Sequence, residues 1–391
     1  ATQLQTINNA TAGNVIIPDK AVTLTGTAAA LVEALTGSVT EVTTGNKIEG
    51  NITITGAGGN PNATQLKAIN DATNASIIVP SKAVALSGTA AVLKAALAGS
   101  VTEVTTGDKI EGTLTITVEN PSLADLQELN TAVNGIIEIQ DKTLALNGTA
   151  AAVAEALAGT VREVTTGAAI TGNMTLTTDP NATQLQTINN ATAGNVIIPN
   201  AGITLSGTPA VLTEALTGSV ATAGSAKISG TVTVTTSDPN VTQLKTINDA
   251  IDGAIVVPSK AVTLSGTAAA LVDALAGTVT DSSNAKIEGK VTITGGNPDA
   301  TQLQAINNAT DGAIDIPSKL VALTGNADVL AAALAGTVRE VTSGDKITGN
   351  VTINDTPTEV ELQTINNATT ASIQIPAANQ TFTASASVLA E

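Results

Sequence analysis

Few side chains in this sequence can carry out acid–base or nucleophilic chemistry. The chain has no cysteine and no histidine, and it contains 33 acidic and 16 basic residues. Without an imidazole or a thiol, the usual nucleophile–base pairs cannot be assembled. Four glutamates share one position of the repeat described below, and we interpret that position as a solvated rim rather than as catalytic carboxylates: Glu41, Glu103, Glu163 and Glu340. The sequence therefore predicts that the protein is not an enzyme.

Loops rich in oxygen atoms are the candidates for binding a hard cation such as Ca²⁺. They have the pattern Asp/Asn-Pro-Asn/Asp and lie at Asn60–Asn62, Asp179–Asn181, Asp238–Asn240 and Asn297–Asp299. Each loop supplies few carboxylates, and its last residue is a good helix N-cap, so capping is the favoured interpretation. We therefore predict no metal site and no cofactor, with Ca²⁺ as the one ion left open.

Pairs of threonines separated by one residue are a regular polar pattern in the chain. They recur in one segment of the repeat, at Thr53/Thr55, Thr115/Thr117, Thr175/Thr177, Thr233/Thr235 and Thr292/Thr294. Stacked in a flat sheet, they would form a lattice of hydroxyl and methyl groups like the face of an ice-binding solenoid. Threonine is also a good strand former on a solvated face, which is the favoured interpretation. A ligand-binding surface for ice or carbohydrate is therefore the second hypothesis for function, although the single aromatic residue, Phe382, leaves little for sugar stacking.

Asn-x-Ser/Thr sequons are frequent, as expected by chance in a chain rich in Asn and Thr. Examples start at Asn9, Asn51, Asn62, Asn173, Asn181 and Asn350. Chance occurrence is the favoured interpretation, and glycosylation is the alternative.

An internal repeat runs from one end of the chain to the other. A motif related to Thr-Gln-Leu-Gln-Thr-Ile-Asn-Asn-Ala-Thr recurs every 59 to 62 residues, with its leading leucine at Leu4, Leu66, Leu126, Leu185, Leu244, Leu303 and Leu362. Seven repeats therefore start near residues 1, 63, 123, 182, 241, 300 and 359, and the last is truncated. A second leucine or valine follows each of these leucines at a constant spacing, as Leu31 follows Leu4, and we call both residues anchors. A lysine follows most anchors at a shorter spacing, as Lys20 follows Leu4. Each repeat thus divides into two related units, called half-repeats below, and we predict one continuous array, residues 1–391, of about fourteen units.

Each half-repeat has the pattern helix, strand, turn, strand. In the first half-repeat Asn62, with Gln65 three residues later, has the pattern of a capping box; in the second, Thr27 is the expected N-cap. Gly37 fits the position after a helix end. A proline or a glycine then separates the two strand segments. An Ile-x-Gly motif, as in Ile48–Gly50, predicts a bulge or a corner before the second strand.

Half-repeats of this size cannot bury their own apolar face, so neighbours must stack. We predict an α/β repeat protein, an elongated solenoid in which each half-repeat adds one rung to parallel ladders. Helices pack about 8–10 Å apart whereas parallel strands lie about 4.8 Å apart, so such a stack must curve or offset its helices. The alternative is a two-layer array of helix plus β-hairpin units, since two strands match one helix in width. The turn at Thr106–Lys109 would suit that hairpin.

The pairing of Thr-Leu-Thr-Gly-Thr-Ala-Ala with Leu-Gln-Thr-Ile-Asn-Asn-Ala-Thr-Ala-Gly resembles the Thr/Ala-rich tandem repeats of giant secreted bacterial proteins. Those proteins include S-layer and haemolysin-like surface proteins of cyanobacteria and proteobacteria. The resemblance covers the whole chain and implies an extracellular, assembled and often Ca²⁺-dependent structural role. The Gly-Gly-x-Gly-x-Asp nonapeptides that bind Ca²⁺ in many such proteins are absent from this sequence, which argues against calcium dependence here.

The leading hypothesis is therefore an extracellular structural protein at the bacterial cell surface, part of a surface layer, sheath, adhesin stalk or filament. A net charge of −17 disfavours nucleic acid or an anionic membrane as a partner. No apolar run approaches the roughly 18–20 residues that insert across a bilayer. The expected partners are copies of the chain or adjoining repeats, end to end. The sequence starts in one helix and stops in the equivalent of the other, 385–391, without an obvious polar cap, which predicts a window of a longer array or a stacked protomer.

Overall fold

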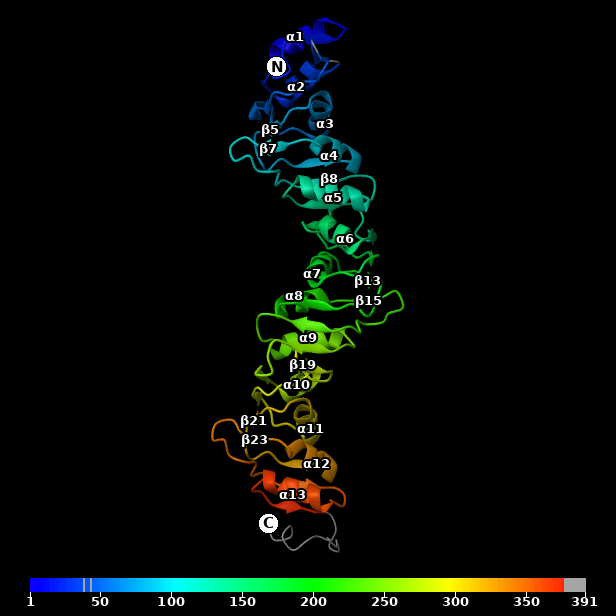
Figure 1. Cartoon of the computed structure of the whole chain (residues 1–391). Helices are drawn as coiled ribbons and strands as arrows, with labels where there is room; N and C mark the ends of the chain where they lie inside the picture. Colours follow the sequence, from blue (N-terminus) through cyan, green and yellow to red (C-terminus); the bar gives the residue numbers. More distant parts are fainter. Residues whose placement is uncertain (38, 43, 376–391) are drawn as a thin grey trace. The chain divides into compact units, whose positions relative to one another are not determined.

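The computed structural model describes residues 1–37, 39–42 and 44–375 (Figure 1). Thirteen α-helices alternate with pairs of short strands in this part of the chain, which confirms an α/β protein of repeated helix–strand units. Two compact lobes are formed. The first lobe contains Ala1–Asp179 and Thr187–Pro199, and the second contains Pro180–Gln186 and the described residues from 200 to 375.

The first lobe contains six complete helices. They are α1 (Thr2–Ala10), α2 (Ala28–Leu35), α3 (Ala63–Ala72), α4 (Ala90–Leu97), α5 (Leu123–Ala132) and α6 (Ala150–Ala156); α7 (Ala182–Ala191) contains the boundary between the lobes. The strands are β1 (Val15–Ile17), β2 (Leu24–Gly26), β3 (Val39–Glu41), β4 (Ile52–Ile54), β5 (Ile77–Val79), β6 (Leu86–Gly88), β7 (Val101–Glu103), β8 (Leu114–Ile116), β9 (Ile137–Ile139), β10 (Leu146–Gly148), β11 (Val161–Glu163), β12 (Met174–Leu176) and β13 (Val196–Ile198). A 3₁₀ turn, η1 (Gly56–Gly58), follows β4.

Side-chain caps begin the helices where the sequence predicts them. Asn62 Oδ1 accepts a hydrogen bond from the Gln65 N–H at 2.9 Å, and Gln65 Oε1 accepts one from the Asn62 N–H at 3.1 Å. In the second half-repeat, Thr27 Oγ1 accepts from the Ala30 N–H. Gly37 follows the end of α2 with a φ of +91°, the left-handed conformation in which glycine closes helices. Both predicted cap types are confirmed.

The strands pair in parallel, and each complete sheet of the first lobe is shared by two consecutive repeats. One sheet has the order β2-β4-β5-β7 and the next has β6-β8-β9-β11. In the first of these sheets, β2 and β4 are the second strands of the two half-repeats of one repeat. β5 and β7 are the first strands of the two half-repeats of the repeat that follows. Ile52 of β4 lies opposite Ile77 of β5 in the parallel register. Successive repeats are therefore joined by main-chain pairing as well as by side-chain packing.

The hairpin alternative is wrong. β7 and β8, the strands on either side of the turn at 106–109, lie in different sheets. The turn itself contains a single antiparallel bridge, between Thr102 and Lys109, and the Glu103 carboxylate also closes it by accepting from the Thr105 and Thr106 N–H groups. Its Gly107 has a φ of +72°, so the expectation of a glycine break at this position is confirmed.

Sharing the sheets also removes the mismatch in width between helices and strands. Each complete four-stranded sheet accompanies two helices. Four parallel strands span about 19 Å, and two packed helices span about 16–20 Å. The width of two parallel strands thus equals the width of one helix, which is the match that the hairpin alternative also offered. The sequence did not reveal this arrangement because strands far apart in the chain supply it.

The core lies between the sheets and the helices. Across one sheet, the inward side chains of Leu24, Ile52, Ile77 and Val101 stand in one row, because each is opposite the next in register. All four are buried, as is the helix anchor Leu66. The short helices, which would not be stable alone in water, are held by this apolar face.

The Ile-x-Gly motif forms a corner, as predicted. Ile48 makes a parallel bridge to Thr73 of the following repeat, and the chain then bends at Gly50 before β4 begins. A Cβ on Gly50 would overlap the Val22 carbonyl, so only glycine fits this close approach of two backbones. The backbone of the following repeat lies equally close to a corner glycine. A Cβ on Gly135, which follows the first helix of one repeat, would overlap the carbonyl of Gly112, the corner glycine of the repeat before it. At this place the corner and the second strand of one repeat contact the residues that follow the first helix of the next repeat. We call this contact the repeat joint.

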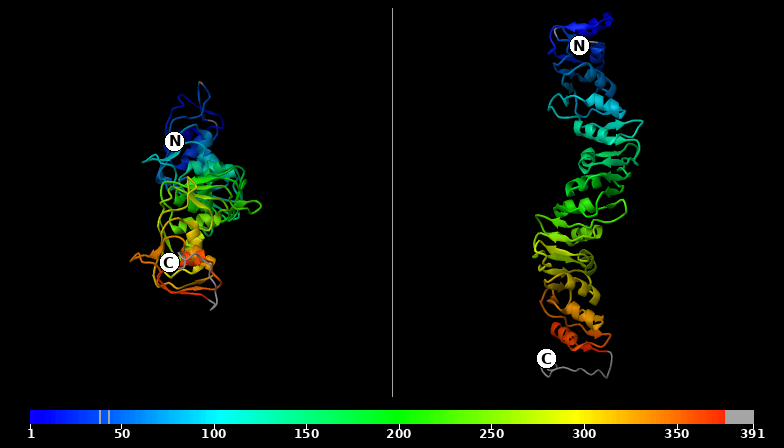
Figure 2. Two further views of the ribbon diagram at one scale, coloured as in Figure 1. Left: turned by 60° about the horizontal axis from the view of Figure 1, so that its bottom comes forward. Right: turned by 45° about the vertical axis from the view of Figure 1, so that its right-hand side comes forward.

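The second lobe repeats this architecture. Its helices are α8 (Pro209–Leu216), α9 (Val241–Ala250), α10 (Ala268–Ala274), α11 (Ala300–Ala309), α12 (Ala327–Leu334) and α13 (Glu359–Ala368). Its strands are β14 (Leu205–Gly207), β15 (Val220–Thr222), β16 (Val232–Val234), β17 (Ile255–Val257), β18 (Leu264–Gly266), β19 (Val279–Asp281), β20 (Val291–Ile293), β21 (Ile314–Ile316), β22 (Leu323–Gly325), β23 (Val338–Glu340), β24 (Val351–Ile353) and β25 (Ile373–Gln374). Two four-stranded sheets, β14-β16-β17-β19 and β18-β20-β21-β23, and the three-stranded sheet β22-β24-β25 follow in chain order. This part of the chain is coloured from green to red in Figure 2.

The last predicted helix, 385–391, and Phe382 lie outside the described residues. Among the helices that the structure describes, none combines the length and the apolar character that a membrane crossing requires.

Candidate functional site

The threonine pairs do not form one continuous ladder in the described structure. The first member of each predicted pair is half-buried at the centre of a strand: Thr53 in β4, Thr115 in β8, Thr175 in β12, Thr233 in β16 and Thr292 in β20. The second member, Thr55, Thr117, Thr177, Thr235 or Thr294, follows the strand, and its N–H donates to the carbonyl of the glycine that ends the neighbouring strand. Because β4 and β8 belong to different sheets, their threonines are not neighbours.

The register also places other side chain types beside each threonine. Thr53 lies between Thr25 of β2 and Ile78 of β5. In the next sheet, Thr115 Oγ1 hydrogen-bonds to Glu138 on its β9 side. The outer faces of the sheets are therefore mixed rather than a lattice of hydroxyl and methyl groups.

The two arginines of the chain both sit on these outer faces, opposite an acid. Arg162 of β11 contacts Glu138 of β9 at 2.8 Å, and Arg339 of β23 contacts Asp315 of β21 at 3.0 Å. Each pair is directly opposite in the parallel register. Asp315 is only 2% exposed and also contacts Lys290 at 3.0 Å. Opposite charges across two strands stabilise one register, so these pairs specify strand alignment.

The expectation that the recurring glutamates form a solvated rim is wrong: three of the four are buried, and the fourth, Glu340, is half-buried. Glu41, Glu103 and Glu163 are at most 8% exposed. The Glu163 carboxylate accepts hydrogen bonds from the N–H groups of Thr165 and Thr166 and from Thr166 Oγ1, at 2.6 to 2.8 Å. These bonds, that from the Thr166 hydroxyl above all, lower the pKa of Glu163 to about 2. The glutamate thus stays ionised and holds a tight loop closed.

The lysines that follow the anchors have two roles. In first half-repeats the ammonium pairs with an acid of the second half-repeat, in Lys20–Glu49, Lys82–Glu111, Lys260–Glu288 and Lys319–Asp345. The hydrogen bond with Glu111 raises the pKa of Lys82. In second half-repeats the ammonium donates to a carbonyl in the last turn of the next repeat's first helix, from Lys47, Lys109, Lys227 and Lys346. A cation at a helix C-terminus is favourable because of the helix dipole.

An asparagine that the sequence reasoning missed links the two helices of a repeat. Asn70 Nδ2 in α3 donates to the Ala95 carbonyl in α4 at 2.7 Å. The same bond, at the same sequence separation, is made by Asn8, Asn130, Asn248 and Asn307. This residue is the first asparagine of the Ile-Asn-Asn/Asp motif, except in the third repeat, where Asn130 lies between Leu129 and Thr131. Its constant spacing from the second helix was the available signal.

The sequons and the oxygen-rich loops lie at structural positions. Asn51, Asn173 and Asn350 are exposed at the corner before a strand, and Asn9 is exposed in the last turn of α1. Asn62 and Asn181 cap helices, in the loops considered as cation sites. No cluster of three metal-binding side chains occurs among the residues that the structure describes.

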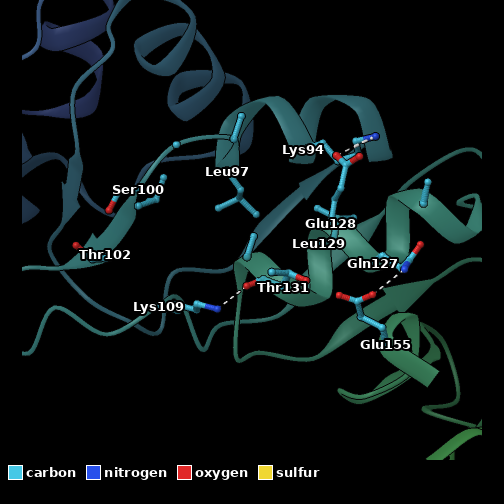
Figure 3. A pocket seen from close by; sticks show the side chains of 15 residues that line it. Lys94, Leu97, Ser100, Thr102, Lys109, Gln127, Glu128, Leu129, Thr131 and Glu155 are labelled. Carbon is cyan, nitrogen blue, oxygen red and sulfur yellow. Dashed lines mark hydrogen bonds and ion pairs between the residues drawn. The ribbon is translucent and has the colours of Figure 1, made fainter. Parts of the chain in front are cut away.

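A groove of about 750 Å³ lies between α4 and α5 in the first lobe (Figure 3). Its charged side chains contact one another or the main chain. Lys94 pairs with Glu128 and Asp125, and Gln127 donates to Glu155. Lys109 points to the Thr131 carbonyl at the end of α5 (Figure 3). These groups connect half-repeats to one another.

Comparison with protein-family models finds no match to this chain, and comparison with curated proteins finds no significant match.

Proposed function

We propose that this chain is a structural, non-enzymatic array of repeats from an extracellular surface protein, such as a surface layer, sheath, adhesin stalk or filament. The observation that carries the proposal is the shared sheet: within each lobe, two strands of one repeat and two of the next pair in parallel. A repeat joined in this way extends along one direction. We propose accordingly that the array is a solenoid and that it meets copies of itself or adjoining repeats end to end.

The recurring residues support this proposal because their contacts lie within and between repeats. The corner glycines allow two backbones to touch, the asparagines link helices, and the second-half lysines bind the helix ends of the following repeat. A surface selected for binding a small ligand would instead repeat groups that point outward. Most of the polar motifs that recur in this sequence thus have a mechanical use inside the array.

Labelling of intact cells of the source organism tests the proposed location. An antibody raised against the folded chain should label unpermeabilised cells or the structures they shed, and mild protease treatment of those cells should remove the label. A cytoplasmic protein of the same cells is the control for lysis. Label that appears only after permeabilisation, with the chain recovered as a free cytoplasmic monomer, would contradict the proposal.

A further inference from the structure

One sequence occurs twice in this chain, in two different surroundings. Residues 1–18 and 182–199 are identical, Ala-Thr-Gln-Leu-Gln-Thr-Ile-Asn-Asn-Ala-Thr-Ala-Gly-Asn-Val-Ile-Ile-Pro. The second occurrence takes part in a repeat joint, whereas the first has no second half-repeat packed against it in the described structure. Differences between the two therefore report what the joint contributes.

In the second occurrence the residues after the helix are bonded to the preceding repeat. Thr192 Oγ1 and the Ala193 N–H both donate to the Ile170 carbonyl, at 2.8 and 2.7 Å. A Cβ on Gly194 would overlap the Gly172 carbonyl. The strand that follows, β13, pairs with β12.

In the first occurrence the same groups face outward. Thr11 is exposed, and β1 pairs with β3 alone among the described strands. A Cβ on Gly13 would have only Thr11 Oγ1, at 3.5 Å, within contact distance. A glycine without positive φ and without a close neighbour has no local reason to be glycine.

The apolar residues of this segment are also uncovered. Ile7 of α1 is 53% exposed, whereas Ile69, at the same position of the next repeat, is 0% exposed. Ile16 of β1 is 62% exposed, whereas Ile78 in β5 is half-buried beside Thr53. α1 buries none of its residues, in contrast to α3, α5 and α9.

We propose that α1, residues 11–14 and β1 form a docking surface for a second half-repeat of the same kind as residues 150–181. Its Ile-x-Gly corner would accept hydrogen bonds from Thr11 and Ala12, and its corner glycine would lie against Gly13. Its Ile/Met-Thr-Ile/Leu strand would pair with β1, and its Ala/Leu helix would cover Ile7. At the equivalent Gly194, it is the corner carbonyl of Gly172 that leaves no room for a Cβ. The inference rests on the proposed array, and it names the surface and the chemistry of its partner.

A fusion protein tests the docking surface directly. Residues 123–181 placed before Ala1 reproduce the native junction between Asn181 and Ala182, because the following eighteen residues are identical. Hydrogen–deuterium exchange of this fusion is compared with that of the original chain. Proteolytic peptides that extend to Lys20 or to Ala201 distinguish the two identical segments by mass. We expect exchange at residues 12–17 to slow by on the order of a hundredfold, toward the rate at residues 193–198.

Gly13→Val is the matched control. In the original chain it should leave exchange unchanged, because the position is open. In the fusion protein it should abolish the new protection, because the valine would collide with the corner carbonyl. Residues 193–198 serve as the internal standard for a folded joint. Unchanged exchange at residues 12–17 in the fusion, or protection that survives Gly13→Val, would overturn the proposal. A fusion that scatters X-rays as a longer rod while residues 12–17 stay unprotected would refute the docking surface and leave the proposed array intact.

Discussion

At the residue scale, a few polar side chains fix the backbone of each repeat. Glutamates close tight loops, asparagines link helices, and threonines and asparagines begin helices. Each satisfies main-chain groups that would otherwise lack partners. The local geometry of a repeat is thus held by hydrogen bonds as well as by its small aliphatic core.

Glu163 should make stability depend on pH in the acid range. Its pKa is about 2 in the folded chain, below its ordinary value of 4.5, so the unfolded chain binds the proton more readily. Its contribution is therefore complete above about pH 4.5 and is lost as the pH falls toward 2. Glu163→Gln should lower the urea midpoint at pH 7 and flatten the loss of stability between pH 5 and 3. The exposed Glu119→Gln controls for the change in charge, and an equal pH response in both variants would contradict the loop contacts.

Val118 is the residue most clearly strained by its backbone. It has a φ of +79° and is 84% exposed, while the equivalent residue in a later repeat is Gly295, with a φ of +83°. A β-branched residue with a positive φ is strained by about 1–2 kcal/mol. Glycine removes this strain, and only part of the gain is lost to the greater conformational freedom of glycine in the unfolded chain. We expect Val118→Gly to stabilise the chain by about 1 kcal/mol in urea denaturation. Val104→Gly, at an exposed valine without positive φ, should destabilise it instead; the opposite order of the two variants would contradict the strain.

At the element scale, helices of seven to ten residues and strands of two or three are stable only when packed. Their burial differs along the chain for one repeated position, the isoleucine of the first helix. Ile69 is fully buried at a joint and Ile7 is half exposed.

These two isoleucines should respond very differently to truncation. Ile69→Ala should lower the free energy of unfolding by about 2–5 kcal/mol, because it leaves a cavity between sheet and helices. Ile7→Ala should change it by roughly 0.5 kcal/mol or less, as expected at a surface. Circular dichroism in urea gives both values, with Ile69→Val as an intermediate control at about 1 kcal/mol. Equal losses at the two positions would show that α1 is covered in solution.

The order of elements and the parallel direction of the strands were predicted from the sequence, whereas the choice of which strands pair was not. Helix caps, glycine turns and the Ile-x-Gly corner depend on particular residues close together in the sequence. Residues such as Asn62, Thr27 and Gly50 therefore predict them. The pairing of β4 with β5 joins segments on either side of a helix, and no local pattern encodes it. The buried glutamates were misjudged because a charged residue in a polar loop looks solvent-exposed when its hydrogen-bond donors are not known. The linking asparagines were missed because their acceptors are main-chain carbonyls, which the sequence does not display.

At the scale of the whole molecule, the same joint recurs inside both lobes. In the first lobe β4 pairs with β5, and in the second β16 pairs with β17. If every repeat is joined to the next in this way, the chain is one solenoid whose length grows with the number of repeats. That continuity is the central proposal, since the proposed structural role and the docking surface both depend on it.

Small-angle X-ray scattering of the chain in dilute solution tests this proposal most directly. Fourteen half-repeats, each about two strand spacings or 10 Å long, give a rod of roughly 130–140 Å. Such a rod has a radius of gyration of about 40 Å, whereas a compact domain of this length has one of about 21 Å. We expect the larger radius of gyration, with the linear cross-section region that rods show at intermediate angles. The smaller radius of gyration, with a globular scattering profile, would contradict a continuous solenoid.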